Sequence, residues 1–238
     1  MRVVAHAKLT LSLRVTGVRP DGYHLIDAEM TTLDLADELR IDDGEGISLD
    51  GEPVEGGDDL VGRALAVAGE MANVRITKRI PAGAGLGGGS ADAAAVLRWA
   101  GVDDLHRAAS LGADVPFCLV GGRARVAGIG EVVEPLPFVP ESYTLVLAPF
   151  GCSTPAVYAA WDELGGPAGD NGNDLEPAAL HVEPRLAAIR DAIADATGAR
   201  PRLAGSGATW FLSGELADLR VAGCRTVVTR TVPGQGSG

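Results

Sequence analysis

The first segment of the chain alternates apolar and polar residues. Leucines occupy every second position from Leu9 to Leu13, with polar residues between them. An alternation of period two is typical of a strand that buries one face, so the sequence predicts a strand over residues 2–15. Lys8 and Thr10 then share the polar face of this strand. Taken alone, a lysine in that position is most simply a solubilising surface charge.

The next segments continue with strands and a helix. We expect two strands within residues 25–50, joined by a polar turn at 34–37. Apolar residues with helical spacing predict a helix over 60–72. Asp58 or Asp59 is expected to be its N-cap, because a short acidic side chain accepts hydrogen bonds from the free N–H groups of a first turn.

The second half of the chain has the same mixture in a different order. Three prolines between residues 132 and 140 indicate a linker. We therefore predict an α+β protein with two domains, residues 1–140 and 141–238. Beyond the linker, the patterns predict a strand at 143–149, helices at 154–164 and 184–197, a glycine loop and strand within 202–212, a short helix after it, and a last strand at 226–231.

A glycine-rich stretch separates a strand predicted at 74–80 from an alanine-rich helix. Five of the nine residues from 81 to 89 are glycine, Ser90 is placed to cap the helix, and Asp92 lies in its first turn. Glycines expose backbone N–H groups, and the start of a helix adds unpaired donors and a positive dipole end. Together these features favour a bound phosphate. The alternative, a flexible surface turn, would carry a large backbone entropy cost.

The glycine stretch also has a resemblance to dinucleotide-binding loops. It is not a Walker A motif, because no Gly-Lys-Ser or Gly-Lys-Thr follows it. Residues 83–88 match Gly-x-Gly-x-x-Gly, and Asp103 or Asp104 lies about 20 residues further on. That fingerprint usually opens a doubly wound succession of strands and helices, which the rest of this chain lacks.

Composition and charge narrow the possible partners. The chain has 238 residues, 46% of them hydrophobic, which is ordinary for a globular protein with its own core. A net charge of −12 disfavours a nucleic-acid surface. We expect no membrane span and no secretory signal, since no long apolar run or basic-then-apolar N-terminus occurs. Three widely spaced cysteines suit a reducing cytosol, so we expect a cytoplasmic protein. The oligomeric state is left open.

Several charged and aromatic residues are candidates for chemistry. Only two of the 20 basic residues are lysines, Lys8 and Lys78, so both are candidates for positions that require an ammonium group. A Pro-Asp-Gly turn presents Tyr23 and His24, which either bind a planar base or are an ordinary core residue and surface residue.

An aspartate between a helix-ending glycine and a proline is a further candidate. Asp114 precedes the apolar run that begins at Val115. It is either an ordinary N-cap or turn residue, or a general base or a carboxylate paired with a lysine.

Five segments in chain order resemble the GHMP kinase superfamily. They are Ala-Lys-Leu-Thr-Leu at 7–11, Asp-Gly-Tyr-His at 21–24, the glycine stretch at 81–91, Leu-Gly-Ala-Asp-Val-Pro-Phe at 111–117 and Gly-Ser-Gly-Ala-Thr at 205–209. The glycine stretch alone resembles the superfamily. The second and fourth segments are similar to its branch that phosphorylates a cytidine diphosphate-linked polyol of non-mevalonate isoprenoid biosynthesis. The resemblance implies a two-domain α+β fold with the active site in the inter-domain cleft.

The resemblance also implies roles for individual residues of an ATP- and Mg²⁺-dependent kinase. Asp114 would be the general base for the substrate 2-hydroxyl, and Lys8 would orient it and stabilise the transferring phosphoryl group. Tyr23, His24 and Tyr158 would bind the cytosine. The implied ATP positions are Asp59, Lys78, Pro81, Gly83, Gly85, Leu86, Gly87, Gly88, Gly89 and Ser90, the further substrate positions are Thr154, Gly205 and Ser206, and Ser90 is a candidate ligand of Mg²⁺ or phosphate.

Three positions differ from the family's usual residues. Asp59 and Thr10 stand where the family has Asn, and Tyr158 stands where it usually has Phe. Tyr keeps the aromatic face that a stacked base needs.

Three other functions compete with this interpretation. The Asp-Gly-Tyr-His segment argues against another small-molecule GHMP kinase. A non-catalytic nucleotide-binding module would not need both Lys8 and Asp114. A dinucleotide-binding oxidoreductase is disfavoured by the order of the predicted elements.

Overall fold

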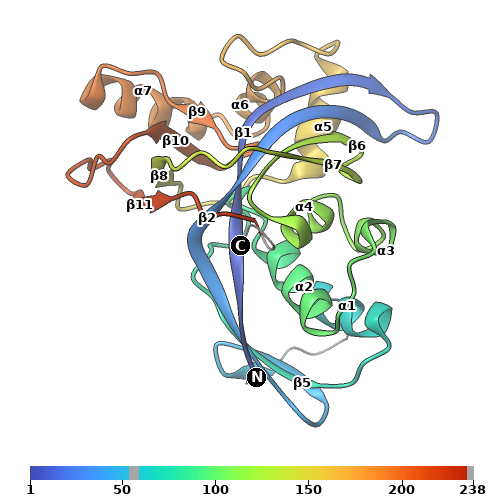
Figure 1. Cartoon of the computed structure of the whole chain (residues 1–238). Helices are drawn as coiled ribbons and strands as arrows, with labels where there is room; N and C mark the ends of the chain where they lie inside the picture. Colours follow the sequence, from blue (N-terminus) through green and yellow to red (C-terminus); the bar gives the residue numbers. More distant parts are fainter. Residues whose placement is uncertain (54–58, 235–238) are drawn as a thin grey trace.

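The computed structural model describes residues 1–53 and 59–234, which form two β-sheets with helices packed against them (Figure 1). The strands are β1 (Arg2–Val18), β2 (His24–Asp42), β3 (Gly46–Leu49), β4 (Glu52–Pro53), β5 (Asn73–Thr77), β6 (Arg123–Gly128), β7 (Val132–Leu136), β8 (Ser142–Leu147), β9 (Arg202–Leu203), β10 (Thr209–Ser213) and β11 (Arg225–Arg230). The helices are α1 (Leu60–Ala68), α2 (Gly88–Trp99), α3 (Leu105–Ala109), α4 (Val115–Val120), α5 (Thr154–Glu163), α6 (Glu176–Val182) and α7 (Arg185–Thr197). Within the described ranges, no helix combines the length and the apolar character that crossing a membrane requires. The predicted α+β class is confirmed.

The long antiparallel hairpin of β1 and β2 is the backbone of the first sheet. In the described residues this sheet has seven strands in the order β4-β3-β5-β2-β6-β7, with β1 also paired to β2. Figure 1 shows the hairpin running through the whole molecule, with α1 to α4 on one side of it. All pairings except that of β3 with β5 are antiparallel. A doubly wound parallel sheet is thereby ruled out, as the element order indicated.

Two strands do occupy residues 25–50, but the expected break between them at 34–37 was wrong, because β2 is continuous from His24 to Asp42 and β3 begins only at Gly46. The residues that indicated a turn serve other segments instead. The Asp37 carboxylate accepts hydrogen bonds from the backbone N–H groups of Arg79 and Ile80. Tertiary partners therefore satisfy side chains that, in isolation, favour a turn.

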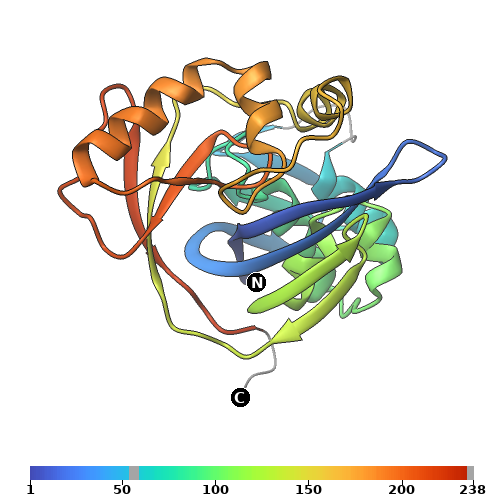
Figure 2. The ribbon, with the colours of Figure 1, turned by 90° about the horizontal axis from the view of Figure 1, so that it is seen from above.

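The second sheet is antiparallel throughout, with the order β11-β8-β10-β9. Viewed from above, α7 runs alongside its strands (Figure 2). No helix forms between β10 and β11, so the short helix expected there was wrong. The predicted linker is partly strand, since Pro135 lies in β7, an edge strand where a missing N–H is tolerated. A domain boundary at residues 140 and 141 stays a prediction.

Helix α2 is the most deeply packed helix of the first domain. Five consecutive residues from Ala93 to Leu97 are each no more than 1% exposed. Its N-cap is Gly87 in the left-handed conformation, so the expectation that Ser90 caps it was wrong. Alanine side chains let the helix lie close against the sheet and the neighbouring helices, while its N-terminal residues, Gly88 to Ser90, line the cleft described below.

Helix α1 begins as the sequence predicted. Asp59 is its N-cap and accepts hydrogen bonds from the N–H groups of Val61 and Gly62 at 2.8 and 2.9 Å. Asp58, the other candidate, lies outside the described residues.

Truncating the buried face of α2 should destabilise the protein. Leu97→Ala removes a side chain that is fully buried, and we expect the free energy of unfolding to fall by about 2–5 kcal/mol. Leu164→Ala is the matched control, because Leu164 is 45% exposed and its truncation should change the free energy by less than about 0.5 kcal/mol. Urea unfolding measures both, and equal losses would contradict the packing described for α2.

Candidate active site

One cleft of about 1200 Å³ gathers every residue that the sequence predicted for the site. Its lining comes from the glycine stretch, β1, α5 and the segment around Gly205. Residues from both parts of the chain, before and after β8, the first strand of the second sheet in chain order, therefore line the cleft. The predicted residues that line it are Lys8, Tyr23, His24, Asp59, Lys78, Pro81, Gly83, Gly85, Leu86, Gly87, Gly88, Gly89, Ser90, Asp114, Thr154, Tyr158, Gly205 and Ser206.

Lys8 and Asp114, far apart in sequence, form an ion pair in the cleft. The Lys8 Nζ atom lies 3.2 Å from Asp114 Oδ2 and donates to the Thr10 hydroxyl at 3.0 Å. The Lys8 side chain is only 7% exposed, whereas that of Asp114 is 31% exposed. A buried ammonium beside an accessible carboxylate leaves the carboxylate free to receive a proton from a substrate.

Local irregularities of the chain aim both side chains. The pairing of β1 with β2 shifts register between His6 and Lys8, and a bulge of this kind redirects a side chain out of the regular strand pattern. Asp114 stands at the N-cap position of α4 but makes no capping hydrogen bond. Its carboxylate is thus available to Lys8, so the simple N-cap interpretation of Asp114 is wrong.

The first glycine loop, residues 81–87, joins β5 to α2 beside this pair. Its backbone is tied to the strand that carries the lysine, because the Lys8 N–H donates to the Leu86 carbonyl at 3.0 Å. Gly87 has φ +68°, and a Cβ there would lie 2.8 Å from the Lys8 Cγ. The Leu86 side chain is fully buried, so this residue offers only its backbone to a ligand. The predicted order of strand, glycine loop and helix is confirmed.

A second glycine loop, residues 204–208, packs directly on the first. A Cβ added to Gly85 would lie 2.5 Å from the Gly207 carbonyl oxygen, and Gly85 also has φ +75°. The Thr209 hydroxyl donates to the Ala84 carbonyl at 2.7 Å, which joins the two loops again. Ser206 and Thr154 share a hydrogen bond of 2.7 Å at the rim of the cleft. Only glycine allows backbone to approach backbone this closely.

The ammonium group of Lys78 lies beneath the first glycine loop. It binds the buried carboxylates of Asp37 and, at 2.7 Å, Asp92. Burial alone would lower the pKa of Lys78, but the charges of Asp92 and Asp37 raise it. Burial raises the pKa of Asp92 to about 7 in spite of Lys78. The network joins β2, β5 and α2, and so fixes the segments on both sides of the loop.

Aromatic residues form a further part of the cleft lining. The rings of His24 and Tyr158 lie 4.7 Å apart between centroids, and Trp161 meets the His24 ring edge-on. The His24 Nε2 atom lies 2.9 Å from the carboxylate of Asp162. Tyr23 is 59% exposed beside them, so the interpretation of Tyr23 as a core residue is wrong, and so is that of His24 as a surface residue.

Neither the sequence patterns nor the resemblance indicated two contacts of the site, Asp162 with His24 and Asp37 with Lys78. For Asp162 a signal was present, because Tyr158 and Asp162 are four residues apart on α5 and share a helix face. Asp37 looked like a turn residue, and only the fold brings it to Lys78.

The described part of the chain offers few side chains that could bind a metal ion. It contains no group of three His, Cys, Asp or Glu side chains that could hold a metal ion. The Ser90 hydroxyl lies in the first turn of α2 on the cleft wall, and one carboxylate oxygen of Asp92 is buried without a hydrogen-bond partner. This set suits an ion such as Mg²⁺ that takes most of its ligands from phosphates and water.

Comparison with known proteins identifies the family. The model of the GHMP kinases N terminal domain matches residues 59–122. A 4-diphosphocytidyl-2-C-methyl-D-erythritol kinase of Paracoccus denitrificans is 39% identical over 98% of this chain and 93% of its own length. That of Paramagnetospirillum magneticum is 38% identical, over 92% of this chain and 91% of its own. The chain belongs to the 4-diphosphocytidyl-2-C-methyl-D-erythritol kinase family.

Solved structures agree with this assignment. A crystal structure of 4-(cytidine 5'-diphospho)-2C-methyl-D-erythritol kinase superposes with a TM-score of 0.78 at 33% identity, over 99% of this chain and 100% of the other. The mevalonate kinase of Methanococcus jannaschii gives a TM-score of 0.64 at 13% identity, with 98% of each chain covered, and shares the fold. The two-domain GHMP kinase fold expected from the sequence is thereby confirmed.

The contact between the two glycine loops can be tested with one methyl group. Gly85→Ala would force a Cβ against the Gly207 carbonyl oxygen, so the loops must separate. We expect turnover with ATP to fall by roughly a hundredfold, because small misplacements in an active site have effects of that size.

Gly101→Ala is the matched control for this substitution. Gly101 also has a positive φ, +73°, but a Cβ there meets no atom within 4 Å. Both variants should lose about 1 kcal/mol of folding free energy through their positive φ, and Gly85→Ala more because of its clash with backbone oxygens. Only Gly85→Ala should lose turnover in the fraction of protein that is folded. Equal turnover of the two variants, followed as ADP release, would count against the loop contact.

Proposed function

We propose that this protein transfers the γ-phosphoryl group of ATP to the 2-hydroxyl of 4-diphosphocytidyl-2-C-methyl-D-erythritol, a step of non-mevalonate isoprenoid precursor biosynthesis. The Lys8–Asp114 pair is the observation that carries the proposal. It lies in a cleft that is also lined by a glycine loop and by paired aromatic rings. Such a cleft can hold a nucleoside triphosphate and a base-bearing acceptor so that their reactive groups meet between them.

Asp114 acts as the general base in the proposed reaction. Its carboxylate accepts the proton of the acceptor hydroxyl as the oxygen attacks the γ-phosphorus, and the bond from phosphorus to the β,γ-bridging oxygen breaks to release ADP. Lys8 holds the carboxylate in place at 3.2 Å and offsets negative charge on the transferring phosphoryl group. Phosphoryl transfer depends mainly on such positioning and charge stabilisation.

The first glycine loop and the N-terminus of α2 hold the ATP phosphates. Unpaired N–H groups at a helix N-terminus favour anions, and the glycines let the phosphates approach the backbone. Asp59, Lys78 and Pro81 line the same wall of the cleft. Ser90 would hold Mg²⁺ together with the nucleotide phosphates, and the ion would supply charge neutralisation there.

The aromatic residues of the cleft bind the cytosine of the acceptor. Tyr23, His24 and Tyr158 present ring faces and hydrogen-bonding groups suited to a planar base. The acceptor also contacts Thr154, Gly205 and Ser206, which line the same cleft as Lys8. The three cysteines are free thiols, which agrees with a protein that works in the reducing cytoplasm.

The alternatives from the same fold are less well supported. Another small-molecule kinase would have no use for the His24–Tyr158 pair, and a non-catalytic module would not need the ion pair in its cleft. No observation favours either of them.

Removing either member of the ion pair should abolish most of the turnover. Asp114→Asn keeps the shape but cannot accept the proton, and Lys8→Ala leaves the carboxylate unoriented, so kcat should fall by roughly 10²–10⁴-fold in each. ADP release from ATP, Mg²⁺ and the cytidyl substrate measures it.

Asp27→Asn is the control for the charge change. It removes an exposed carboxylate that pairs with Arg125 at 2.8 Å on the first sheet, away from the cleft, and should leave kcat unchanged. Undiminished turnover in Asp114→Asn, or none in the unmodified protein, would refute the proposal.

Tyr158 should matter through its ring and not through its hydroxyl. Burial raises the pKa of Tyr158 to about 12, so the hydroxyl stays protonated across the neutral pH range. Tyr158→Phe should therefore leave the KM for the cytidyl substrate within about twofold at every pH in that range. Tyr158→Ala should raise it roughly 5- to 100-fold, since base stacking contributes about 1–3 kcal/mol.

The KM for ATP serves as the internal control for both variants, because neither substitution changes the glycine loop proposed to hold the nucleotide. Tight substrate binding in Tyr158→Ala would speak against the assignment of the cytosine site.

A further inference from the structure

The segment before α6 carries a buried amide that reaches the second glycine loop. Asn173 is 3% exposed. Its Nδ2 donates to the Leu203 carbonyl at 3.0 Å and to the Gly205 carbonyl at 2.7 Å. Its Oδ1 accepts from the Leu175 N–H at 3.0 Å. Because a carbonyl can only accept, this orientation of the amide is the one that satisfies all three partners.

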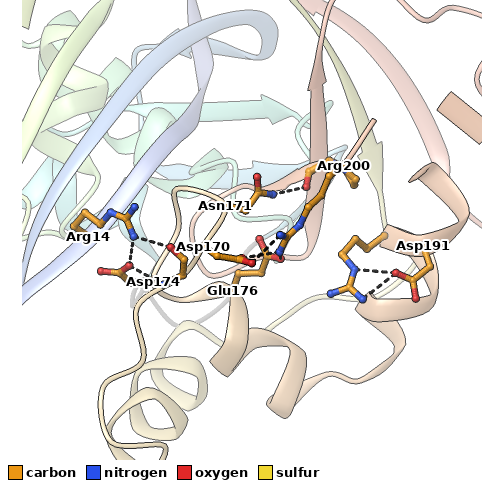
Figure 3. Close-up of polar contacts among 10 residues, drawn as sticks. Arg14, Asp170, Asn171, Asp174, Glu176, Asp191 and Arg200 are labelled. Atoms are coloured by element: carbon orange, nitrogen blue, oxygen red, sulfur yellow. Dashed lines mark hydrogen bonds and ion pairs between the residues drawn. The ribbon is translucent and has the colours of Figure 1, made fainter. Parts of the chain in front are cut away.

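The same segment is fixed to the strand that carries Lys8. The Asp174 N–H donates to the Leu13 carbonyl at 2.9 Å, and the Leu13 N–H donates to the Gly172 carbonyl at the same distance. The buried Asp174 carboxylate binds the Arg14 guanidinium and accepts from the Val15 N–H. Figure 3 shows the Arg14–Asp174 pair beside the contacts of Arg200 with Asp170 and Glu176.

Asn173 thereby connects β1 to the second glycine loop through one rigid segment. The close approach of Gly169 reinforces it, since a Cβ there would lie 1.8 Å from the Asn173 carbonyl oxygen. At the far end, a Cβ on Gly205 would lie 3.5 Å from Thr10 Oγ1 and 3.7 Å from Lys8 Nζ. The loop that Asn173 holds therefore lies directly against the catalytic lysine and its hydroxyl partner.

The second glycine loop has one polar side chain of its own, Ser206, whose bond to Thr154 does not reach the Gly205 carbonyl. Gly205 has φ +60° and Gly207 φ +94°, and glycine is the residue with the most conformational freedom. Within the described chain, Asn173 is the only side chain that bonds the Gly205 carbonyl. Two hydrogen bonds from one planar amide fix both the place and the orientation of the loop that bears Ser206.

We propose that Asn173 is a positioning residue of the phosphoryl-transfer site, which aligns the second glycine loop over Lys8 and keeps Ser206 turned toward the acceptor. The inference rests on the proposed kinase function. The residue touches neither substrate nor nucleotide and acts through the backbone of residues 203–205.

The test is Asn173→Asp, which keeps the shape of the side chain and replaces the two donors by a carboxylate facing two carbonyl oxygens. We expect kcat to fall roughly tenfold to a hundredfold, because the loop must move away. The KM for ATP should stay within about twofold, because the first glycine loop holds the nucleotide. A purely structural role would lower the thermal midpoint without this split between kcat and KM.

Asn171→Asp is the matched control. Asn171 lies two residues away, and its amide donates to the Pro201 carbonyl at 2.8 Å, outside the loop (Figure 3). The same change of chemistry there should leave kcat unchanged.

The pH profile gives a second readout. A carboxyl group buried among carbonyls has a raised pKa, and once protonated it regains one O–H donor. The kcat of Asn173→Asp relative to the unmodified protein should therefore increase as the pH falls. Asn173→Leu, which removes the donors without adding a carboxylate, should lose kcat with no such recovery.

The outcomes separate this inference from the proposed function. If the unmodified protein shows no turnover, the proposed function fails and the inference fails with it. If it turns over and Asn173→Asp matches Asn171→Asp, the inference alone fails. Unfolding of both Asn173 variants would also overturn it, because the side chain would then maintain the fold and not the alignment of the loop.

Discussion

Backbone meets backbone where the two glycine loops touch, and the geometry of the cleft depends on that contact. Gly85 and Gly207 come so close that a single methyl group cannot be accommodated between them. Each loop belongs to a different sheet, so their contact sets how the two halves of the cleft face each other. Lys8 lies where both loops converge, against Gly87 on one side and Gly205 on the other.

Glycine-rich loops need anchors elsewhere, and buried polar residues supply them. Asp37 accepts the N–H groups of Arg79 and Ile80 at the start of the first loop. Asn173 plays the corresponding part for the second loop. Burying such groups is costly unless their hydrogen bonds are made. The satisfied network therefore favours one loop arrangement over its alternatives.

Much of the site could be predicted from sequence because its motifs are local. The glycine stretch, the Asp-Gly-Tyr-His turn and the segment around Asp114 each keep their chemistry within a few residues, and all of them line the cleft. Asn173 could not be found in that way, because it acts on a partner distant in sequence, Gly205. Asp162 could be found only through its place one turn after Tyr158 on α5, since its partner His24 is distant too. The same holds for the continuous β2, where Asp37 matches a turn pattern until its distant partners are known.

The chain's last strand returns to its first hairpin, which bears on how the protein is made. The Val232 N–H donates to the Thr32 carbonyl at 3.0 Å, and Asp34 of β2 accepts from Thr229 and from the Arg230 N–H. Contacts between residues some 200 positions apart close a large loop and form slowly. During synthesis, the part of β2 around Asp34 lacks these partners until β11 has been made. A nascent chain arrested before β11 would therefore present the polar groups of β2 around Asp34 unpaired.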